Sequence, residues 1–464
     1  MAVRDSGESL GETSIVGPQH LDYEVQRRVF NGLIDRHPAA IVKCKSHSDV
    51  ISAVRIARER KWKIAVRGGG HSVAGFGTCD DGLVIDLSLM RRVRVDAENR
   101  IATVEGGALW SDVDKATQKF GLAVPGGEIS TTGVGGLTLG GGHGRLSRAY
   151  GLTADSLLAA NVVTADGTSV ETSSNLEPEL WWALRGGGGN FGVVTSFTFA
   201  LHRVPKYVLG GLLIFGPERA LEAMNLYLWW AKNAPRTMSL EFIAFTAPDL
   251  PEVPKRLRGR PAVAVTVFAF KDIDGGRNVL EYMCMTAPPD ANTVDTTLYV
   301  DYQRSLDRNH PPGMRNYWTA VGQSELNITS ARMFLDSIFP LPSLHSLVLL
   351  MRWDAAICDP VPESSAVPRR RPSWVVHAMA VWSDDAADER AIGWARNVSA
   401  AVSPADDPYL NYVGARSGGQ VAAYFGEDRY ARLVAVKSAW DPDNIFCHNH
   451  NVVPPPGGTN SVSA

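Results

Sequence analysis

Three dense glycine clusters in the first 200 residues constrain the fold of this chain more than any other feature. They read "RGGGHSVAGFG" (67–77), "GVGGLTLGGGHG" (133–144) and "RGGGGNFG" (185–192). Because glycine carries no side chain, it lets the backbone turn sharply and lets a ligand approach the main chain closely. Several backbone N–H groups can then converge on the oxygen atoms of a phosphate. The clusters therefore predict one extended cofactor lying along the N-terminal half of the chain.

Two common nucleotide-binding signatures do not match these clusters. The second cluster contains glycines in spacings like G-x-G-x-x-G, but no acidic residue follows about 20 positions later at the end of a second strand, as an NAD-type unit requires. A P-loop needs Gly-Lys followed by Ser or Thr, and no glycine run ends that way. His71 directly follows the first run of three glycines. From the residues alone it is either a packing residue beside a turn or a side chain that holds the cofactor.

Composition narrows the class of protein. A length of 464 residues suits two or three domains, and 45% hydrophobic with 20% charged residues is typical of a globular protein. A net charge of −3 without a basic stripe argues against nucleic-acid binding. No apolar run approaches the roughly 18 residues of a membrane span, so we expect no membrane partner and a cytoplasmic protein. The five scattered cysteines lack metal-ligand spacing, so we expect reduced thiols, with Cys79 structural, and no metal site.

The order of elements predicts an α+β protein. We expect no order before about Gly17, a helix over 20–33, and a helix from His47 that Ser46 caps. After about residue 206, strands such as "MSLEFIAFT" and "WVVHAMAVW" predict an antiparallel sheet. The arginines at 369–371 end a proline-rich loop and are expected to be solvated or, for one of them, to meet an acidic ligand. Near the C-terminus, "YLNYVG" (409–414) is expected to form a strand.

The glycine motifs, together with "VVTADG" and "WWALRGGGGNFGVVTSF", resemble the vanillyl-alcohol-oxidase and p-cresol-methylhydroxylase (PCMH-type) superfamily of FAD enzymes. The tail "RYARLVAVKSAWDPDNIFCHNHNV" is similar to the C-terminal element of the berberine-bridge-enzyme branch, and most of all to its bacterial secondary-metabolism type. The resemblance implies a two-lobed PCMH-type FAD-binding domain over 1–205. It also implies an inserted substrate domain over 206–404, which is built on the antiparallel sheet. A C-terminal element over 405–464 would complete the FAD domain.

The resemblance further implies that FAD is the cofactor and that a ring nitrogen of His71 is joined to the flavin C8 methyl group. Members with two flavin links carry a cysteine where Ile129 stands here, so a single link is expected. The residues that the resemblance assigns to FAD binding are Arg67, Gly68, Gly69, Gly70, His71, Ser72, Gly77, Thr132, Gly133, Gly136, Gly140, Gly141, Gly142, Gly144, Asp155, Val193, Val194, Asn449 and Asn451.

The implied activity is that of an FAD-dependent oxidase or oxygenase. It would remove hydride from an alcohol or activated C–H of a small secondary-metabolite substrate and pass the electrons to dioxygen. An oligosaccharide or sugar oxidase, and a flavin dehydrogenase with another acceptor, remain as alternatives. Tyr412 is expected to supply a hydroxyl on the substrate side, or else to be a buried strand residue. Glu241 and His377 are further catalytic candidates on predicted strands, whereas His143 and His450 are expected to be packing residues.

Overall fold

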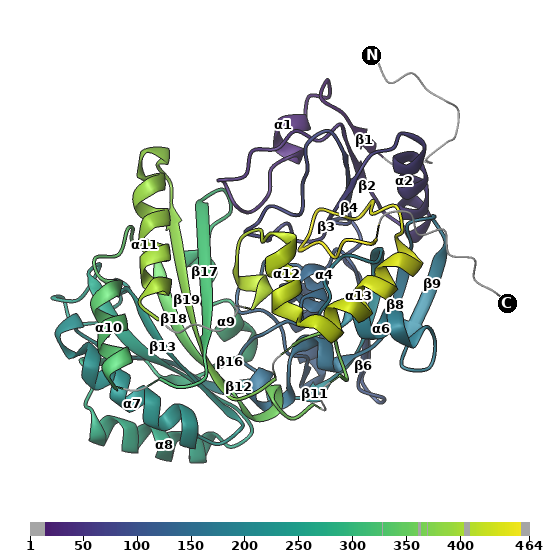
Figure 1. Ribbon diagram of the computed structural model, residues 1–464. Coiled ribbons are helices and arrows are strands. Elements are labelled where there is room, and N and C mark those ends of the chain that lie inside the picture. The colour runs from purple at the N-terminus through teal and green to yellow at the C-terminus, as the bar shows by residue number, and fades with distance from the viewer. Residues whose placement is uncertain (1–13, 327, 361–362, 369, 403–408, 456–464) are drawn as a thin grey trace.

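The computed structural model describes residues 14–326, 328–360, 363–368, 370–402 and 409–455. The chain folds into two lobes (Figure 1). The N-terminal part, purple to blue, and the yellow C-terminal part together form one lobe, and the teal and green segment between them forms the other. The α+β class expected from the sequence is confirmed.

The first sheet of the N-terminal lobe carries the strand that leads into the first glycine cluster. Its order is β1-β2-β4-β3, in which β2, β4 and β3 are parallel and β1 is antiparallel to β2. The strand bounds are Ser14–Val16 (β1), Ala40–Lys43 (β2), Ile64–Arg67 (β3) and Leu83–Asp86 (β4). Helix α2 (His47–Glu59) packs beside it, with Ser46 as its N-cap in a capping box, as predicted.

The second sheet is antiparallel, and the third glycine cluster leads directly into its central strand, β10. Its order is β5-β6-β10-β8-β9. The bounds are Val93–Asp96 (β5), Ile101–Glu105 (β6), Leu157–Val163 (β8), Ser169–Ser173 (β9) and Val193–Ala200 (β10). The accompanying helices are α3 (Trp110–Thr117), α4 (Val134–Leu139), α5 (Ser147–Tyr150) and α6 (Pro178–Leu184), and β7 (Leu122–Ala123) pairs with β11 (His202–Arg203).

The third sheet builds the other lobe and is antiparallel throughout, as predicted. Its order is β15-β12-β14-β13-β18-β19-β17, and β16 pairs with β12. The bounds are Tyr207–Phe215 (β12), Met238–Thr246 (β13), Pro261–Ala269 (β14), Ala291–Asn292 (β15), Asp295–Leu298 (β16), Arg315–Gln323 (β17), Leu347–Trp353 (β18) and Ser373–Trp382 (β19). These strands span 207–382, while the domain boundaries proposed near 205 and 405 stay predictions.

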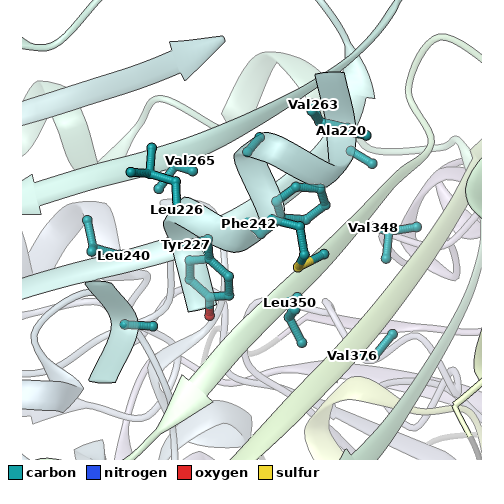
Figure 2. Close-up of a cluster of buried hydrophobic side chains, with 14 of the residues drawn as sticks. Ala220, Leu226, Tyr227, Leu240, Phe242, Val263, Val265, Val348, Leu350 and Val376 are labelled. Carbon is teal, nitrogen blue, oxygen red and sulfur yellow. The ribbon is translucent and has the colours of Figure 1, made fainter. Parts of the chain in front are cut away.

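Alternating side chains give the third sheet two different faces. On one face Phe242, Leu350 and Val376 pack against helix α7 (Ala220–Asn233), whose Tyr227 fits among them (Figure 2). Helices α8 (Ile273–Thr286), α10 (Ile328–Ile338) and α11 (Asp388–Ala400) cover the same face (Figure 1). The opposite face packs toward the N-terminal lobe through Ile243, Leu349 and Met379. Since the strand period is two, Glu241 and His377 belong to this second face.

Three local predictions are wrong. The helix expected over 20–33 is only α1 (Tyr23–Gln26), since the Phe30 N–H donates to the Gly70 carbonyl and draws the following chain across the site. Residues 14–16 form β1 rather than a disordered lead, and residues 1–13 lie outside the described part. The strand expected over 409–414 is a 3-10 turn, Leu410–Tyr412, closed by the Tyr412 N–H bond to the Tyr409 carbonyl.

The C-terminal helices α12 (Gly418–Phe425) and α13 (Glu427–Trp440) follow this turn.

Candidate active site

A cavity of about 310 Å³ lies between the two lobes. The main chain of the three glycine clusters lines one side, and side chains of β17, β18 and β19 line the opposite side. The turn around Tyr412 and the tail residues 446 and 448–450 line the remainder. The cavity therefore joins segments from both ends of the sequence.

The first two glycine clusters touch backbone to backbone. A Cβ atom on Gly69 would lie 2.4 Å from the backbone nitrogen of Gly133, and one on Gly133 would lie 2.3 Å from that of Gly69. No side chain fits at either position without moving the main chain. By contrast, a Cβ on Gly136 or Gly189 would meet nothing within 4 Å. Those two glycines line the cavity, so they leave room for a bound group against the backbone.

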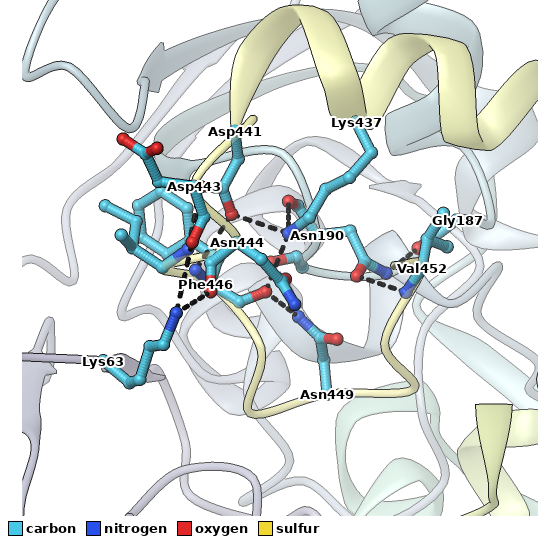
Figure 3. Close-up of polar contacts among 12 residues, drawn as sticks. Lys63, Gly187, Asn190, Lys437, Asp441, Asp443, Asn444, Phe446, Asn449 and Val452 are labelled. Atoms are coloured by element: carbon cyan, nitrogen blue, oxygen red, sulfur yellow. Dashed lines mark hydrogen bonds and ion pairs between the residues drawn. The ribbon is translucent and has the colours of Figure 1, made fainter. Parts of the chain in front are cut away.

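The C-terminal tail is fixed to the third glycine cluster by a buried polar network (Figure 3). Asn190 Oδ1 accepts a hydrogen bond from the Val452 N–H at 2.9 Å. The fully buried Lys437 ammonium donates to the Asp441 carboxylate at 2.6 Å. It also donates to the carbonyl oxygens of Asn190 and Phe446, at 2.8 and 3.0 Å. These bonds satisfy the buried charge and hold the tail along the cavity.

His71 is held in one orientation at the end of the first glycine cluster. Gly70 has a positive φ of 68°, which turns the chain immediately before it. The Phe30 ring stacks on the imidazole, with ring centroids 3.9 Å apart and the planes 19° from parallel. Nε2 lies 2.8 Å from Thr131 Oγ1, whereas Nδ1 has only a 3.5 Å contact with Thr132 Oγ1. Burial, with repulsion from a nearby histidine, lowers the pKa of His71 to about 3, so the ring is neutral.

Tyr412 lies between two histidines. Its hydroxyl oxygen is 3.0 Å from His143 Nδ1, and its ring stacks on that of His377 at 4.3 Å between centroids. Burial raises the pKa of Tyr412, and the negative charge of Glu128 adds to the effect. Burial also lowers the pKa of His143 and lowers that of His377 to about 3. At neutral pH the phenol is therefore protonated and both imidazoles are uncharged.

A buried carboxyl pair adjoins this group. Glu128 lines the cavity, while Glu241 on β13 lies next to it but outside the lining. Burial raises the pKa of Glu241, and repulsion from Glu128 raises it further, whereas Arg145 opposes the rise. The Arg145 guanidinium is 3.7 Å from Glu128. Burial beside Glu128 therefore favours the protonated form of Glu241, and Arg145 lies close enough to pair with the Glu128 carboxyl.

Comparisons with known proteins agree with this geometry. A family model described as an FAD binding domain matches residues 38–173, and one described as berberine and berberine like matches residues 408–453. The chain is 32% identical over 424 residues to an FAD-linked oxidoreductase of Dictyostelium discoideum, covering 90% of this chain and 89% of that protein. It belongs to the berberine bridge enzyme-like family of FAD-linked oxidoreductases.

Two further relatives of this oxidoreductase have named activities. It is 30% identical to the (R)-6-hydroxynicotine oxidase of Paenarthrobacter nicotinovorans, over 95% of this chain and 96% of that one. A crystal structure of 6-hydroxy-D-nicotine oxidase from Arthrobacter nicotinovorans superposes with a TM-score of 0.85 at 28% identity, over 97% and 100% of the two chains. A berberine bridge enzyme-like protein of Physcomitrella patens, at 22% identity, shares the fold with a TM-score of 0.82.

The lining of the cavity suits the chemistry of FAD. Its glycine-lined side is open main chain that can approach a diphosphate closely. Nδ2 of Asn449 donates hydrogen bonds to the carbonyl oxygens of Gly189 and Phe446. Its Oδ1 is buried and receives no hydrogen bond. Nδ1 of His450 is likewise buried and without a partner. Unused acceptors beside an open glycine cradle are what a polar cofactor would satisfy.

The structure brings most of the expected cofactor residues of the oxidoreductase together. Those that line the cavity are Arg67, Gly68, Gly69, Gly70, His71, Ser72, Gly77, Thr132, Gly133, Gly136, Gly140, Val194 and Asn449, joined by the catalytic candidates Tyr412 and His377. Those outside its lining are Gly141, Gly142, Gly144, Asp155, Val193, Asn451 and the catalytic candidate Glu241. Their assigned roles all stay predictions.

Asp155, which is expected to contact FAD, is instead paired with arginine side chains. Its carboxylate receives two hydrogen bonds from Arg370, at 2.7 and 2.8 Å, and lies 3.6 Å from Arg185. The Arg370 side chain is only 6% exposed, so the expectation that the arginine run is solvated is wrong for Arg370. The reason is the buried Asp155 carboxylate, which the local sequence of the loop does not reveal. Arg369 lies outside the described residues. We therefore leave Asp155 out of the proposed cofactor cradle.

Several residues that line the site are not predicted from the sequence to do so. His143 and His450 were expected to pack, but both line the cavity, and His143 pairs with Tyr412. The position of His143 inside the second glycine cluster was a usable signal. Glu128, His310 and Trp318 also line the cavity, and nothing in their local sequence marks them. Among the described residues, no helix combines the length and apolar character that crossing a bilayer requires.

Proposed function

We propose that this FAD-linked oxidoreductase is an oxidase that carries FAD on a single covalent bond to His71, takes hydride from a small organic substrate and passes the electrons to dioxygen. The observation that carries the proposal is the fixed, neutral His71 ring at the start of the glycine cradle. The named activity of the hydroxynicotine oxidase relative supports the small-molecule class of substrate.

The hydrogen bonds of His71 favour Nδ1 as the atom that is joined to the flavin. Thr131 Oγ1 holds Nε2 at 2.8 Å, so that nitrogen is occupied. If Nε2 carries the ring proton and donates it to Thr131, Nδ1 keeps a lone pair. The contact of Nδ1 with Thr132 is at the 3.5 Å limit of a hydrogen bond and leaves this lone pair available. Stacking on Phe30 keeps the ring from turning.

A single link is supported by the absence of a suitable thiol. No described residue lining the cavity is a cysteine, and Ile129 occupies the lining where a second attachment would be expected. Cys79, near His71 in sequence, is fully buried, and burial raises the pKa of its thiol to about 12. A thiol held in this way is not a nucleophile near neutral pH.

Bound flavin supplies an acceptor for a hydride. The chain supplies a route for the proton that the substrate loses at the same time. The Tyr412 hydroxyl can accept that proton on its oxygen while its own proton passes to Nδ1 of His143, 3.0 Å away. This transfer avoids a free phenolate, which burial disfavours. His377 holds the Tyr412 ring in place by stacking on it.

Reoxidation of the flavin tests the oxidase assignment without a known substrate. The purified holoenzyme would be reduced under nitrogen with a stoichiometric amount of dithionite and then mixed with air-saturated buffer. We expect the flavin absorbance to return within seconds. Flavin that stays reduced for many minutes in air would instead identify a dehydrogenase that uses another acceptor.

A further inference from the structure

The side of the cavity that faces the glycine cradle is apolar. The aliphatic and aromatic side chains that form it are Leu306, Trp318, Leu347, Leu349, Met351 and Met379. Recognition of a sugar chain would need several donors and acceptors on this surface, because each hydroxyl taken from water must be replaced by a partner. A surface of this kind fits the body of a compact apolar molecule.

Two histidines are set into this apolar surface. His310 and His377 are each 2% exposed, and both line the cavity. They flank Trp318, with ring centroids 6.2 and 5.5 Å from it and planes close to perpendicular. Nε2 of each imidazole is buried without a hydrogen-bond partner. Buried polar atoms of folded proteins usually have a partner, so these two nitrogens call for one from a bound molecule.

The hydrogen bond of His310 fixes which of its nitrogens carries the proton. Nδ1 lies 3.1 Å from the carbonyl oxygen of Leu306, and a carbonyl can only accept, so Nδ1 is the protonated nitrogen. Burial lowers the pKa of His310, so the ring is neutral at physiological pH. Nε2 is then an acceptor and cannot donate. A group that binds it must bring an N–H or O–H donor.

We propose that the substrate is a compact apolar molecule, aromatic or alicyclic, that presents one N–H or O–H donor to Nε2 of His310, and that His310 is a specificity-determining residue of this site. The proposal rests on the proposed flavin oxidase function and narrows its substrate class. Trp318 supplies an aromatic surface beside the acceptor, so a flat ring and its donor can be bound together. An oligosaccharide is not the expected substrate.

Matched fragments that differ only in the donor test this proposal. Phenol and indole would be titrated against the holoenzyme beside anisole and 1-methylindole, in which a methyl group replaces the donor hydrogen. Cellobiose and maltose would represent sugars. Binding is read from the change in the flavin absorbance spectrum. We expect phenol and indole to bind roughly tenfold more tightly than their capped partners, and the sugars to give no change.

Variants of His310 separate recognition from general damage to the site. The preference for the donor is the ratio of the affinity for phenol to the affinity for anisole. In His310→Leu this ratio should fall to about one, while anisole binds as before. His310→Gln keeps an acceptor and should restore part of the preference. His37→Leu, which changes an exposed histidine outside the cavity lining, should leave the preference unchanged.

The flavin content of each protein is measured first. Protein that binds no flavin contradicts the proposed function itself. With flavin bound, only the substrate inference is at stake. It is overturned if capped and uncapped fragments bind equally, if none of the aromatic fragments binds, or if a sugar binds or reduces the flavin. It is also overturned if His310→Leu keeps the full preference for the donor.

Discussion

The hydroxyl oxygen of Tyr412 lies 3.0 Å from Nδ1 of His143 and joins the C-terminal turn to the second glycine cluster. The two residues are 269 positions apart in the sequence. Burial keeps the phenol protonated and the imidazole neutral, so their hydrogen bond can carry a proton in one direction when a substrate releases one. The pair is therefore a candidate proton acceptor whose two members are far apart in the sequence.

Removing the Tyr412 hydroxyl should slow catalysis without releasing the cofactor. In Tyr412→Phe we expect the rate of flavin reduction by a substrate to fall roughly 100-fold, because the proton loses its first acceptor. Stopped-flow absorbance measures this rate, and flavin content should match that of the wild type. Tyr227→Phe is the control, since that buried hydroxyl has no partner and lies against the far face of the third sheet. Equal rates in Tyr412→Phe and the wild type would rule out this role.

Thr131 should control how readily the flavin bond forms. In Thr131→Val the hydrogen bond to Nε2 of His71 is lost, so the ring no longer favours one tautomer. Loss of one such bond corresponds to about 1 kcal/mol, so we expect covalent attachment to apoprotein to slow several-fold. The fraction of flavin that survives acid precipitation, followed over time after FAD is added, gives the rate. Thr131→Ser should attach FAD at the wild-type rate, and a normal rate in the valine variant would count against the role of the hydroxyl.

The bond between Asp155 and Arg370 should stabilise the fold strongly. Arg370→Ala leaves the Asp155 carboxylate buried with a weaker partner, which typically costs about 3 kcal/mol or more. Denaturant unfolding would measure the loss. The matched control is Arg236→Ala, which breaks an ion pair whose side chains are 57% and 52% exposed. An exposed pair of this kind contributes about 1 kcal/mol or less. Similar losses in both variants would contradict the structural role of Arg370.

Buried neutral histidines should make the protein less stable in mild acid. The folded pKa of His377 is about 3, whereas an unfolded histidine titrates near 6.5. Below about pH 6.5 the unfolded chain binds the extra proton, so this stability is complete above pH 6.5 and is lost as the pH falls toward 3. We expect a loss of about 1 kcal/mol from His377 between pH 7.5 and 5.5. Denaturation of His377→Leu at both pH values should show a smaller decrease than the wild type, and an equal decrease would refute the assignment.

Local patterns were enough to predict much of the fold. Ser46 and the apolar spacing after it predict helix α2, and the alternation in 373–382 predicts a strand of a two-faced sheet. The glycine clusters predict a ligand cradle because their chemistry is local: only glycine permits the contact between Gly69 and Gly133. The helix and strand signals and the glycine runs themselves depend on residues that are neighbours in the sequence, whereas the contact between Gly69 and Gly133 is made by the fold.

Other features depend on partners that are distant in the sequence. The segment around Phe30 has a helical pattern, but its bond to Gly70 and its stacking on His71 give it another conformation. Arg370 is buried because it binds the carboxylate of Asp155, which is 215 positions away in the sequence. The cavity that His310 lines forms only where its segment meets the distant glycine clusters. No local periodicity encodes these pairings, which is why the substrate side of the site was less predictable than the cofactor side.

Peptide mapping of the flavin tests the central claim most directly. The purified protein would be denatured in acid, washed free of unbound cofactor, digested, and analysed by mass spectrometry. We predict that one peptide, the one containing His71, carries the added mass of one FAD, and that His71→Ala protein carries none. Flavin that washes away completely from the wild type, or that is found on a peptide without His71, would contradict the account.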